Sequence, residues 1–511
     1  MAAFCWKGVP LTRVGGRAAV LRDCRGFTRR AVALRERSLP GRCSAQKRLG
    51  RLQLQVGTRQ LRVFISTGEV SGDMHGAALA KSLRKQATER AGESRLLLRG
   101  VGGPSMREAG VELYADTLSI SSIGIFEAVR FVLPAFLAYE KAKKELLEDP
   151  PDVAVLIDYI GPNAAIASWF REFLPGVPVI YYIGPQQWIW ESDGNPAPRL
   201  LDYFPVLREC CRCLVAIFPL EAEFYRQKLL KLGALNGPPE IVYVGHPILD
   251  LVKPTSQQAA RAKLAWSSSD RAYVAVMLAS REQEVGALLP ATARAALAIE
   301  KTMSKRHPSK RIYFVVPVAR EEFTDRIRRL LIEQGVPADR ITQHAHGPGG
   351  LESETLFHLV PRTQSRLVLA AADLAICKSG TVNLEAAALG VPQIVLYRLS
   401  KTSAFLIRRV FRMRLPYVSA VNVVSLDRPI VPELLQENLT TDRIYEEAMA
   451  LLENRDGCAD RMREAYQSEV LPRLRLTAEN HEPEQVSAAD RAAAVVWRYL
   501  EQAQRSIAYT P

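Results

Sequence analysis

From residue 61 onward, short apolar runs that are rich in β-branched residues alternate with stretches of helical pattern. Strands that are apolar along their whole length, and that are separated by helices, indicate parallel sheets covered by helices on both faces. The sequence therefore predicts an α/β fold. The predicted strands are Leu61–Ser66, Val153–Ile157, Val177–Ile183, Leu214–Phe218, Ile241–Val244, Tyr273–Leu278, Ile312–Val316, Leu374–Cys377 and Gln393–Leu396.

The length of this alternation bears on the number of domains. It continues for about 400 of the 511 residues, whereas a single core seldom grows beyond about 250–300 residues. We predict two doubly wound, Rossmann-like domains that face a cleft, with residues 61–245 in the first and 246–483 in the second. A helix and tail are expected at 484–511. Ligands of such sheets bind beyond the carboxyl ends of the strands, in the cleft between the domains.

The net charge of +14 is concentrated at the N-terminus. Residues 1–60 contain 12 Arg and 2 Lys but only one Asp and one Glu, so 12 of the 14 net positive charges fall there. An arginine-rich, acid-poor leader without a continuous apolar region is typical of an organelle transit peptide. We predict a mitochondrial location, with a plastid as the alternative, because Arg dominates the leader and Ser is sparse. A basic tail that stays attached is the other interpretation.

The rest of the chain is nearly neutral, which argues against a nucleic-acid-binding protein. No apolar run reaches the about 18–20 residues that a membrane-spanning helix needs. Cys210, Cys211 and Cys213 form a cluster, but no second pair of Cys or His follows at zinc spacing. The sequence therefore predicts neither a metal site nor a bound cofactor.

Candidate site residues of the first half follow two predicted strands. A glycine-containing segment, 67–76, comes directly after the first strand and holds Glu69, Ser71 and Asp73 as residues that would face the cleft. A tight strand-to-helix turn would explain the same pattern. Asp158 directly follows the predicted strand Val153–Ile157 and is placed to accept a proton from a hydroxyl nucleophile. The alternative role for Asp158 is to cap the following helix.

Two segments of the second half suit a diphosphate. Arg281 lies before a predicted helix, where a guanidinium and the amides of a helix N-terminus together favour phosphate; a surface pairing with Glu282 or Glu284 is the alternative. The segment Ser379-Gly380-Thr381 offers amides and hydroxyls to phosphate, and Glu385 lies one turn into the next helix, where it could hold a ribose diol. A purely structural turn is the alternative for this segment.

Taken in order, these segments resemble the lipid-A-disaccharide synthases, which are glycosyltransferases of the GT-B type. The resemblance covers residues 61–475. The matching strings are Gly68-Glu69-Val70-Ser71-Gly72-Asp73, Gly102-Gly103-Pro104-Ser105-Met106, Gly124-Ile125-Phe126-Glu127, Ile157-Asp158, Pro185 with Trp188 and Trp190, Tyr243-Val244-Gly245-His246-Pro247, Ser379-Gly380-Thr381 with Glu385, and Tyr417-Val418-Ser419 with Asn422.

The resemblance implies a reaction and a set of roles. UDP-diacylglucosamine would donate its sugar to the 6-hydroxyl of diacylglucosamine 1-phosphate, giving a β-1,6-linked disaccharide and UDP with inversion. Asp158 would be the general base and Arg281 would bind the diphosphate. Glu385 and Asn422 would help to hold UDP, and His246 would be a further cleft residue. The family also implies a homodimer.

Acylated substrates would require contact with a bilayer. The stretch Ile123–Leu137 is rich in Ile, Phe, Val and Leu, and Ala404–Val418 mixes apolar residues with arginines. Such patterns suit peripheral binding to a membrane, although helices that pack into the core have them too.

Two other functions remain open. One is a soluble enzyme on the same scaffold, such as a UDP-N-acetylglucosamine 2-epimerase, which would not need the apolar stretch. The other is a non-catalytic protein that binds lipid or nucleotide.

Overall fold

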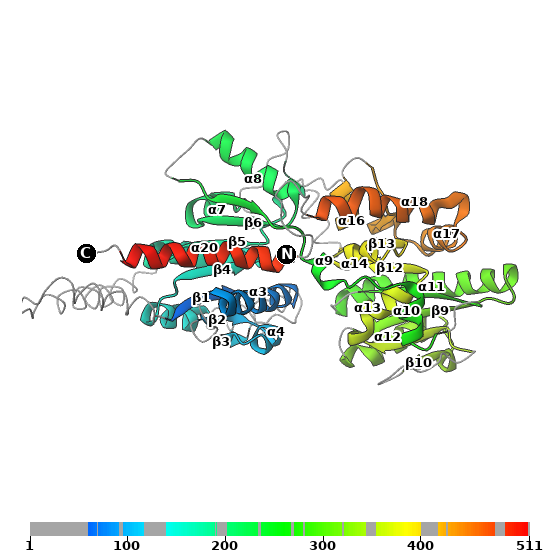
Figure 1. Ribbon diagram of the computed structural model, residues 1–511. Helices are drawn as coiled ribbons and strands as arrows, with labels where there is room; N and C mark the ends of the chain where they lie inside the picture. The colour runs from blue at the N-terminus through cyan, green and yellow to red at the C-terminus, as the bar shows by residue number, and fades with distance from the viewer. Residues whose placement is uncertain are drawn as a thin grey trace, which may run out of the picture. The chain divides into compact units, whose positions relative to one another are not determined.

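The computed structural model describes most of the chain beyond residue 59 (Figure 1). The described ranges are 60–68, 70–90, 96–116, 139–189, 191, 202–232, 237–266, 270–278, 282–318, 321–343, 354–399, 417–425, 428–475 and 486–508. Two compact units divide the chain. One comprises residues 1–120, 125–179 and 495–511, and the other comprises 121–124 and 180–494.

A first sheet has seven described strands in the order β3-β2-β1-β4-β5-β6-β7. Each strand pair whose register is described is parallel. Its strands are β1 (Leu61–Ser66), β2 (Leu96–Gly102), β3 (Glu112–Asp116), β4 (Val153–Ile157), β5 (Val179–Tyr182), β6 (Cys213–Ala216) and β7 (Glu240–Tyr243). The helices in this part of the chain are α3 (Val70–Arg90), α4 (Pro104–Glu108), α6 (Ile160–Phe173), α7 (Phe204–Cys210), α8 (Pro219–Leu232) and α9 (Ile248–Leu251).

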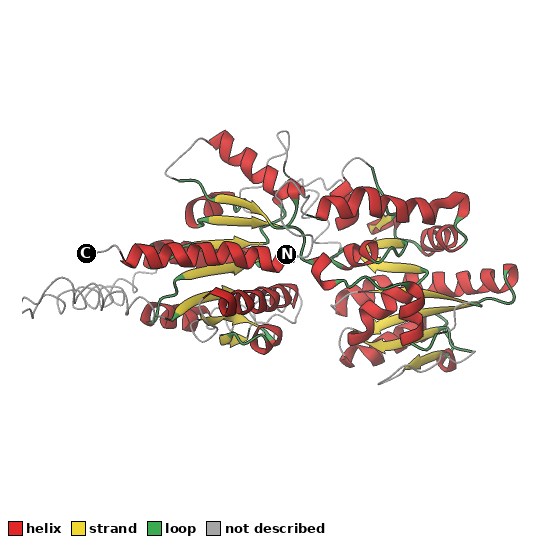
Figure 2. Ribbon diagram, viewed as in Figure 1, coloured by secondary structure: helices red, strands yellow, loops and turns green. Residues whose placement is uncertain are grey.

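A second sheet repeats this plan with the order β10-β11-β9-β8-β12-β13-β14. Its strands are β8 (Arg271–Met277), β9 (Arg311–Val318), β10 (Ile341–Gln343), β11 (Phe357–Pro361), β12 (Leu374–Lys378), β13 (Gln393–Tyr397) and β14 (Glu433–Leu435). Helices flank the strands of each sheet (Figure 2). In this region they are α10 (Gln257–Lys263), α11 (Glu282–Arg306), α12 (Thr324–Glu333), α13 (Ser365–Ala371), α14 (Val382–Ala388), α16 (Ala420–Ser425), α17 (Thr441–Leu452), α18 (Cys458–Ala465) and α19 (Leu471–Leu474).

The last helix, α20 (Ala488–Ala508), returns to the beginning of the chain. The indole N–H of Trp497 donates to the carbonyl oxygen of Leu83 in α3 at 3.4 Å, and Arg90 pairs with Glu501 at 2.7 Å. Among the described residues, no helix combines the length and the apolar character that crossing a membrane requires.

In each sheet the strand order reverses at one place, between β1 and β4 in the first and between β8 and β12 in the second. Right-handed crossovers on either side of such a reversal put helices on opposite faces, which opens a crevice at the carboxyl ends of the two central strands. The register aligns Ser66 with Leu156, and Met277 with Cys377. The residues that follow these four positions are therefore the ones placed to form sites.

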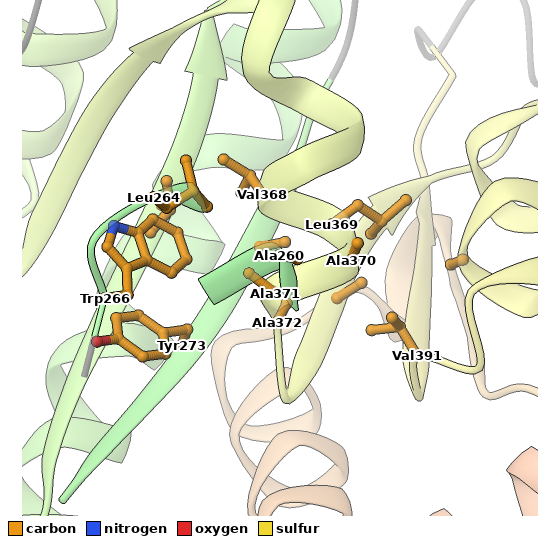
Figure 3. Packing of buried hydrophobic residues seen from close by; sticks show 14 of the residues in the cluster. Ala260, Leu264, Trp266, Tyr273, Val368, Leu369, Ala370, Ala371, Ala372 and Val391 are labelled. Atoms are coloured by element: carbon orange, nitrogen blue, oxygen red, sulfur yellow. The ribbon is translucent and has the colours of Figure 1, made fainter. Parts of the chain in front are cut away.

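A buried cluster in the second unit shows how the strands are held from one face. Trp266 stacks on Tyr273 with 4.4 Å between ring centroids, and Tyr273 stacks on Tyr313 at 5.6 Å. Residues of α10, α13, α14 and the strands β8, β9, β11 and β12 also belong to this cluster, part of which is drawn in Figure 3. Arg261 borders the cluster, where its guanidinium pairs with Asp373 at 2.7 Å and lies over the Tyr273 ring.

The predicted α/β class and the two parallel sheets are confirmed. Every strand predicted from an apolar run is present, with ends that shift by at most two residues. Five further strands had not been singled out, namely β2, β3, β10, β11 and β14. β2 contains Arg99 and three glycines or valines, and β10 and β14 have only three residues each, so none of them carries a long apolar signal. The domain boundaries at 245 and 483 stay predictions.

Candidate active site

Two consecutive residues with strained backbone follow β4. Asp158 and Tyr159 have φ angles of 49° and 45°, in the left-handed region that residues with a side chain seldom adopt. Each such residue costs about 1–3 kcal/mol and persists where surrounding contacts hold it, most often at functional sites. The N-cap residue of α6 is Tyr159, so Asp158 does not occupy the capping position that was its alternative role.

Asn163, in the first turn of α6, holds this bend. Its buried side-chain amide donates from Nδ2 to the carbonyl oxygens of Ile157 at 3.1 Å and Asp158 at 2.9 Å. Its Oδ1 accepts a hydrogen bond from the hydroxyl of Ser66, the last residue of β1, at 2.7 Å. One buried amide therefore joins the ends of two neighbouring strands and fixes the peptide that carries the candidate base.

Gly68 brings the loop after β1 against the ring of Tyr159. A Cβ atom at position 68 would lie 1.9 Å from Cδ1 and 2.2 Å from Cε1 of that ring, well inside van der Waals contact. The glycine is needed here for close approach rather than for an unusual φ angle. The predicted glycine-containing segment therefore contacts Tyr159, the residue after Asp158, at the carboxyl end of β4.

Asp73 is committed to the fold rather than to a cleft. The side chain is 1% exposed, its Oδ1 accepts hydrogen bonds from the N–H groups of Gly103 at 2.8 Å and Met106 at 3.1 Å, and its Oδ2 accepts one from Ser105 at 2.9 Å. A buried carboxylate is well stabilised by three amides at the start of a helix. Ser71 is half-buried in the first turn of α3, and Glu69 lies outside the described residues.

His75, next to these residues in α3, is neutral at physiological pH because burial lowers its pKa to about 4.

His246 lies after β7 in a row of aromatic side chains. It is 4% exposed, and its Nδ1 accepts a hydrogen bond from the N–H of Ile248 at 3.1 Å. Its ring centroid is 4.7 Å from that of Phe218, which is 5.4 Å from that of Trp188. The imidazole therefore helps to build the carboxyl edge of β5 to β7, and one of its nitrogens is already engaged.

The segment Ser379-Gly380-Thr381 after β12 has the predicted strand-turn-helix form. Two of its three residues, however, make hydrogen bonds to other parts of the fold. The N–H of Ser379 donates to Leu396 at 3.2 Å, and its hydroxyl donates to the carbonyl oxygen of Val418 at 2.5 Å. The N–H of Gly380 donates to Oδ1 of Asn383 at 2.9 Å. Thr381, which begins α14 as its N-cap residue, is exposed and is the member of the segment best placed for a ligand.

Glu385 lies one turn inside α14 as expected. Burial raises the pKa of its carboxyl group above the ordinary value, and Arg366 opposes this shift. The Nε atom of Arg366 lies 3.6 Å from Oε2 of Glu385, and the Glu385 side chain is 15% exposed. The carboxylate of Glu385 is therefore partly accessible to solvent, and the guanidinium of Arg366 stabilises its ionised form.

Asn422 uses its whole hydrogen-bonding capacity within the fold. Its Oδ1 accepts from the N–H groups of Ile430 at 2.8 Å and Val431 at 2.9 Å. Its Nδ2 donates to the carbonyl oxygen of Val431 at 2.9 Å and to Glu433 at 2.8 Å. An asparagine amide offers four such bonds, so Asn422 shapes the loop beside Ser379, and a direct contact to UDP stays a prediction.

Glu433 is a residue of this loop that the sequence analysis missed. Its carboxylate accepts hydrogen bonds from the N–H groups of Val418 and Ser419, both at 2.9 Å. A glutamate in a three-residue strand gives no recognisable signal in the sequence. Glu433 thereby fixes the segment of Val418, whose carbonyl oxygen accepts the hydrogen bond from the Ser379 hydroxyl.

Lys378, the last residue of β12, is the other residue that was missed. Its Nζ lies 3.3 Å from Oε2 of Glu284 in the first turn of α11, and both side chains are about three-tenths exposed. Glu284 had been considered as a partner of Arg281. The sequence did contain a signal for Lys378, because this lysine directly precedes Ser379 at the carboxyl end of a predicted strand.

Several predicted features lie outside the described residues. They are Arg281, Trp190, the apolar stretch Ile123–Leu137, residues 404–416 of the second stretch, and all of the leader except Gln60. Within the described ranges, no group of three or more His, Cys, Asp or Glu side chains could hold a metal ion. Cys211 and Cys213 are buried, and burial raises the pKa of the Cys211 thiol.

We expect Gly68→Ala to destabilise the protein by about 1–3 kcal/mol, the usual cost of forcing an atom into a packed site. The added methyl group cannot fit beside the Tyr159 ring without moving a residue whose backbone is already strained. Urea unfolding of the full chain measures the change. Gly176→Ala is the control, because no heavy atom lies within 4 Å of its Cβ position. Equal unfolding midpoints for the two variants would contradict the close approach.

Comparison with known proteins places this arrangement in a family. The family model described as lipid-A-disaccharide synthetase matches residues 63–489. The lipid-A-disaccharide synthase of Gloeothece citriformis is 37% identical over 395 residues, covering 77% of this chain and 91% of that protein. That of Geobacter sulfurreducens is 31% identical over 390 residues, covering 76% and 86%.

Solved structures with far lower identity share the fold. A Listeria monocytogenes structure titled as a UDP-N-acetylglucosamine 2-epimerase gives a TM-score of 0.52 at 12% identity, covering 87% of this chain and 98% of the other. The S. aureus MnaA-UDP co-structure gives 0.52 at 12%, covering 86% and 97%. These likenesses agree with two Rossmann-like domains of the GT-B type. By the family model and by its relatives, the chain belongs to the lipid-A-disaccharide synthase family.

Proposed function

We propose that this hexosyltransferase moves a diacylated glucosamine from UDP to the 6-hydroxyl of diacylglucosamine 1-phosphate, releasing UDP. Membership of the family supports the reaction. The observation that carries the assignment of the base is the bend after β4, where Asp158 and Tyr159 are both in the left-handed region and Asn163 fixes the Asp158 peptide. Strain maintained by a dedicated buried contact indicates a position that is selected for function.

In the proposed mechanism, Asp158 takes the proton of the acceptor hydroxyl as its oxygen attacks the anomeric carbon. The new carbon–oxygen bond forms on the face opposite the UDP oxygen, whose bond breaks, so an α-linked donor gives a β-linked product. General-base catalysis of this kind contributes about 10²–10⁴-fold to the rate. The carboxylate is half-buried, so both solvent and an acceptor can reach it.

The donor would be held by residues of the second sheet. Thr381 and Arg281 are proposed to bind the diphosphate, and Glu385 is proposed to accept hydrogen bonds from the ribose hydroxyls. Ser379 and Asn422 would position this loop, since their side chains are bonded to neighbouring backbone. Cations and helix amides can stabilise the charge that develops on a departing diphosphate.

We also propose a mitochondrial location with peripheral membrane contact through the stretch 123–137, and a homodimer. A plastid is the alternative location. Fluorescent-protein fusions of residues 1–60 distinguish the two organelles, and a diffuse distribution would refute both. Co-sedimentation with anionic vesicles and sedimentation equilibrium test membrane contact and dimer formation.

Asp158→Asn should reduce the rate of UDP release by about 10²–10⁴-fold, since the amide cannot take the proton. UDP affinity should stay unchanged. The assay follows UDP released by the full chain from UDP-diacylglucosamine, with and without diacylglucosamine 1-phosphate. UDP release that depends on both sugars supports the transferase.

The exposed Glu148 provides a matched control, as Glu148→Gln also removes one carboxylate charge from the same unit. A wild-type rate in Asp158→Asn would remove Asp158 as the base. Turnover of UDP-N-acetylglucosamine without any lipid would instead favour an epimerase.

UDP binding should weaken as pH falls, because the ribose diol needs the ionised form of Glu385. Burial raises the pKa of this group, so the loss should begin at a higher pH than for an ordinary glutamate, whose pKa is about 4.3. Calorimetric titration of UDP at several pH values measures it. Glu385→Gln should bind about tenfold more weakly at neutral pH, a loss of about 1.4 kcal/mol.

UDP itself also gains a proton in acid. The quantity to compare is therefore the ratio of the UDP affinity of the wild type to that of Glu385→Gln at each pH. This ratio should shrink toward unity as the pH falls. Glu333→Gln, an exposed change at the end of α12, should follow the wild-type curve at every pH. A constant ratio between Glu385→Gln and the wild type would show that Glu385 does not act through its charge.

A further inference from the structure

Lys378 occupies the position in the second sheet that Asp158 occupies in the first. Each residue stands at the carboxyl end of the strand next to the reversal of strand order, β12 or β4. Each has its carbonyl oxygen bonded by the side chain of the asparagine five residues later. Asn163 Nδ2 donates to Asp158 at 2.9 Å, and Asn383 Nδ2 donates to Lys378 at 3.1 Å.

This position faces the start of a long helix. The register aligns Cys377 with Met277, so Lys378 is level with Leu278, directly before the predicted phosphate loop in the sequence. The ammonium group lies 3.3 Å from the carboxylate of Glu284 in the first turn of α11, a helix of 25 residues. The exposed fractions are 27% for Lys378 and 29% for Glu284, so neither side chain is sealed from solvent.

Building on the proposed function, we infer that Lys378 binds the diphosphate of the sugar-nucleotide donor, and that Glu284 holds this ammonium group until the diphosphate replaces it. The long, flexible side chain of a lysine can turn from one anion to another without moving the strand. A partly exposed ion pair is weak, whereas a diphosphate carries more negative charge than one carboxylate. The exchange therefore favours the ligand.

Neighbouring cations of the same unit are committed elsewhere. Arg366 lies beside Glu385. The guanidinium of Arg398 donates to the carbonyl oxygen of Leu439 at 2.6 Å and to that of Gln436 at 3.2 Å. Of these three cations, Lys378 is the one that ends a central strand at the reversal of strand order, and its carboxylate partner, Glu284, has no part of its own in the proposed binding of the donor.

Two opposite substitutions test the inference in the full chain, by calorimetric titration with UDP and with uridine. Lys378→Met should weaken UDP binding about tenfold, as expected when a charge-assisted hydrogen bond is lost. Glu284→Gln should strengthen UDP binding severalfold, because the competing carboxylate is gone. Uridine lacks phosphate, so its affinity should be the same in both variants and the wild type.

Lys305→Met is the matched control, since it removes an exposed ammonium group from the last turn of the same helix and should leave both affinities unchanged. The double variant Lys378→Met with Glu284→Gln should lose the gain, because Glu284 acts through Lys378. Thermal unfolding identifies a variant that fails to fold, and Glu284→Gln then carries the test alone.

Wild-type UDP affinity in a folded Lys378→Met, equal losses for UDP and uridine, or no gain in Glu284→Gln would each overturn the inference and leave the transferase intact. A wild-type chain that binds no UDP would overturn the proposed function as well.

Discussion

A buried asparagine amide at the end of a central strand is the contact on which both candidate half-sites depend. Parallel strands end in backbone carbonyls that the next helix cannot satisfy, and an unsatisfied buried carbonyl is costly. Asn163 and Asn383 each supply the missing donor from the first turn of the following helix. The backbone at each strand end is thereby held in place, and in the first sheet this holds the left-handed conformation of Asp158 and Tyr159. Chemistry can then vary at that one position without change to its support.

The two sheets use this shared support for opposite charges. The bend of the first carries a carboxylate, Asp158, and the equivalent place in the second carries an ammonium group, Lys378. A glycosyl transfer needs a proton acceptor near the nucleophile and positive charge near the departing diphosphate. In the proposed mechanism, Asp158 would meet the first need and Lys378 the second. The same kind of asparagine contact would then support both roles, although only Asp158 has left-handed backbone.

Features of the fold that depend on burial could be predicted from the sequence. Residue roles that depend on contacts between distant segments could not. Strands such as β1 and β4 were predictable because their residues are buried and apolar throughout, and Asp158 could be placed at a strand end for the same reason. The strands β2, β10 and β14 lack a long apolar run. The roles of Asp73 and Glu433 could not be predicted, since each is defined by backbone amides that only folding brings near. Likewise, nothing in the spacing indicates that Lys378 would meet Glu284.

Motifs that identify a family need not be lists of ligand contacts. His246 and Asn422 belong to the strings that carry the resemblance, yet the structure shows both engaged in building the second unit. The backbone N–H of His246 donates to the carbonyl oxygen of Leu474. The preceding residue, Arg473, donates from its guanidinium to the carbonyl oxygen of Val424 in α16. In the first turn of the same helix, Asn422 donates to the carboxylate of Glu433. These bonds connect the segment after β7 with the loop under Ser379. We expect that loss of a residue that maintains such a connection would move the loop, and that this would affect a ligand without any direct contact to it.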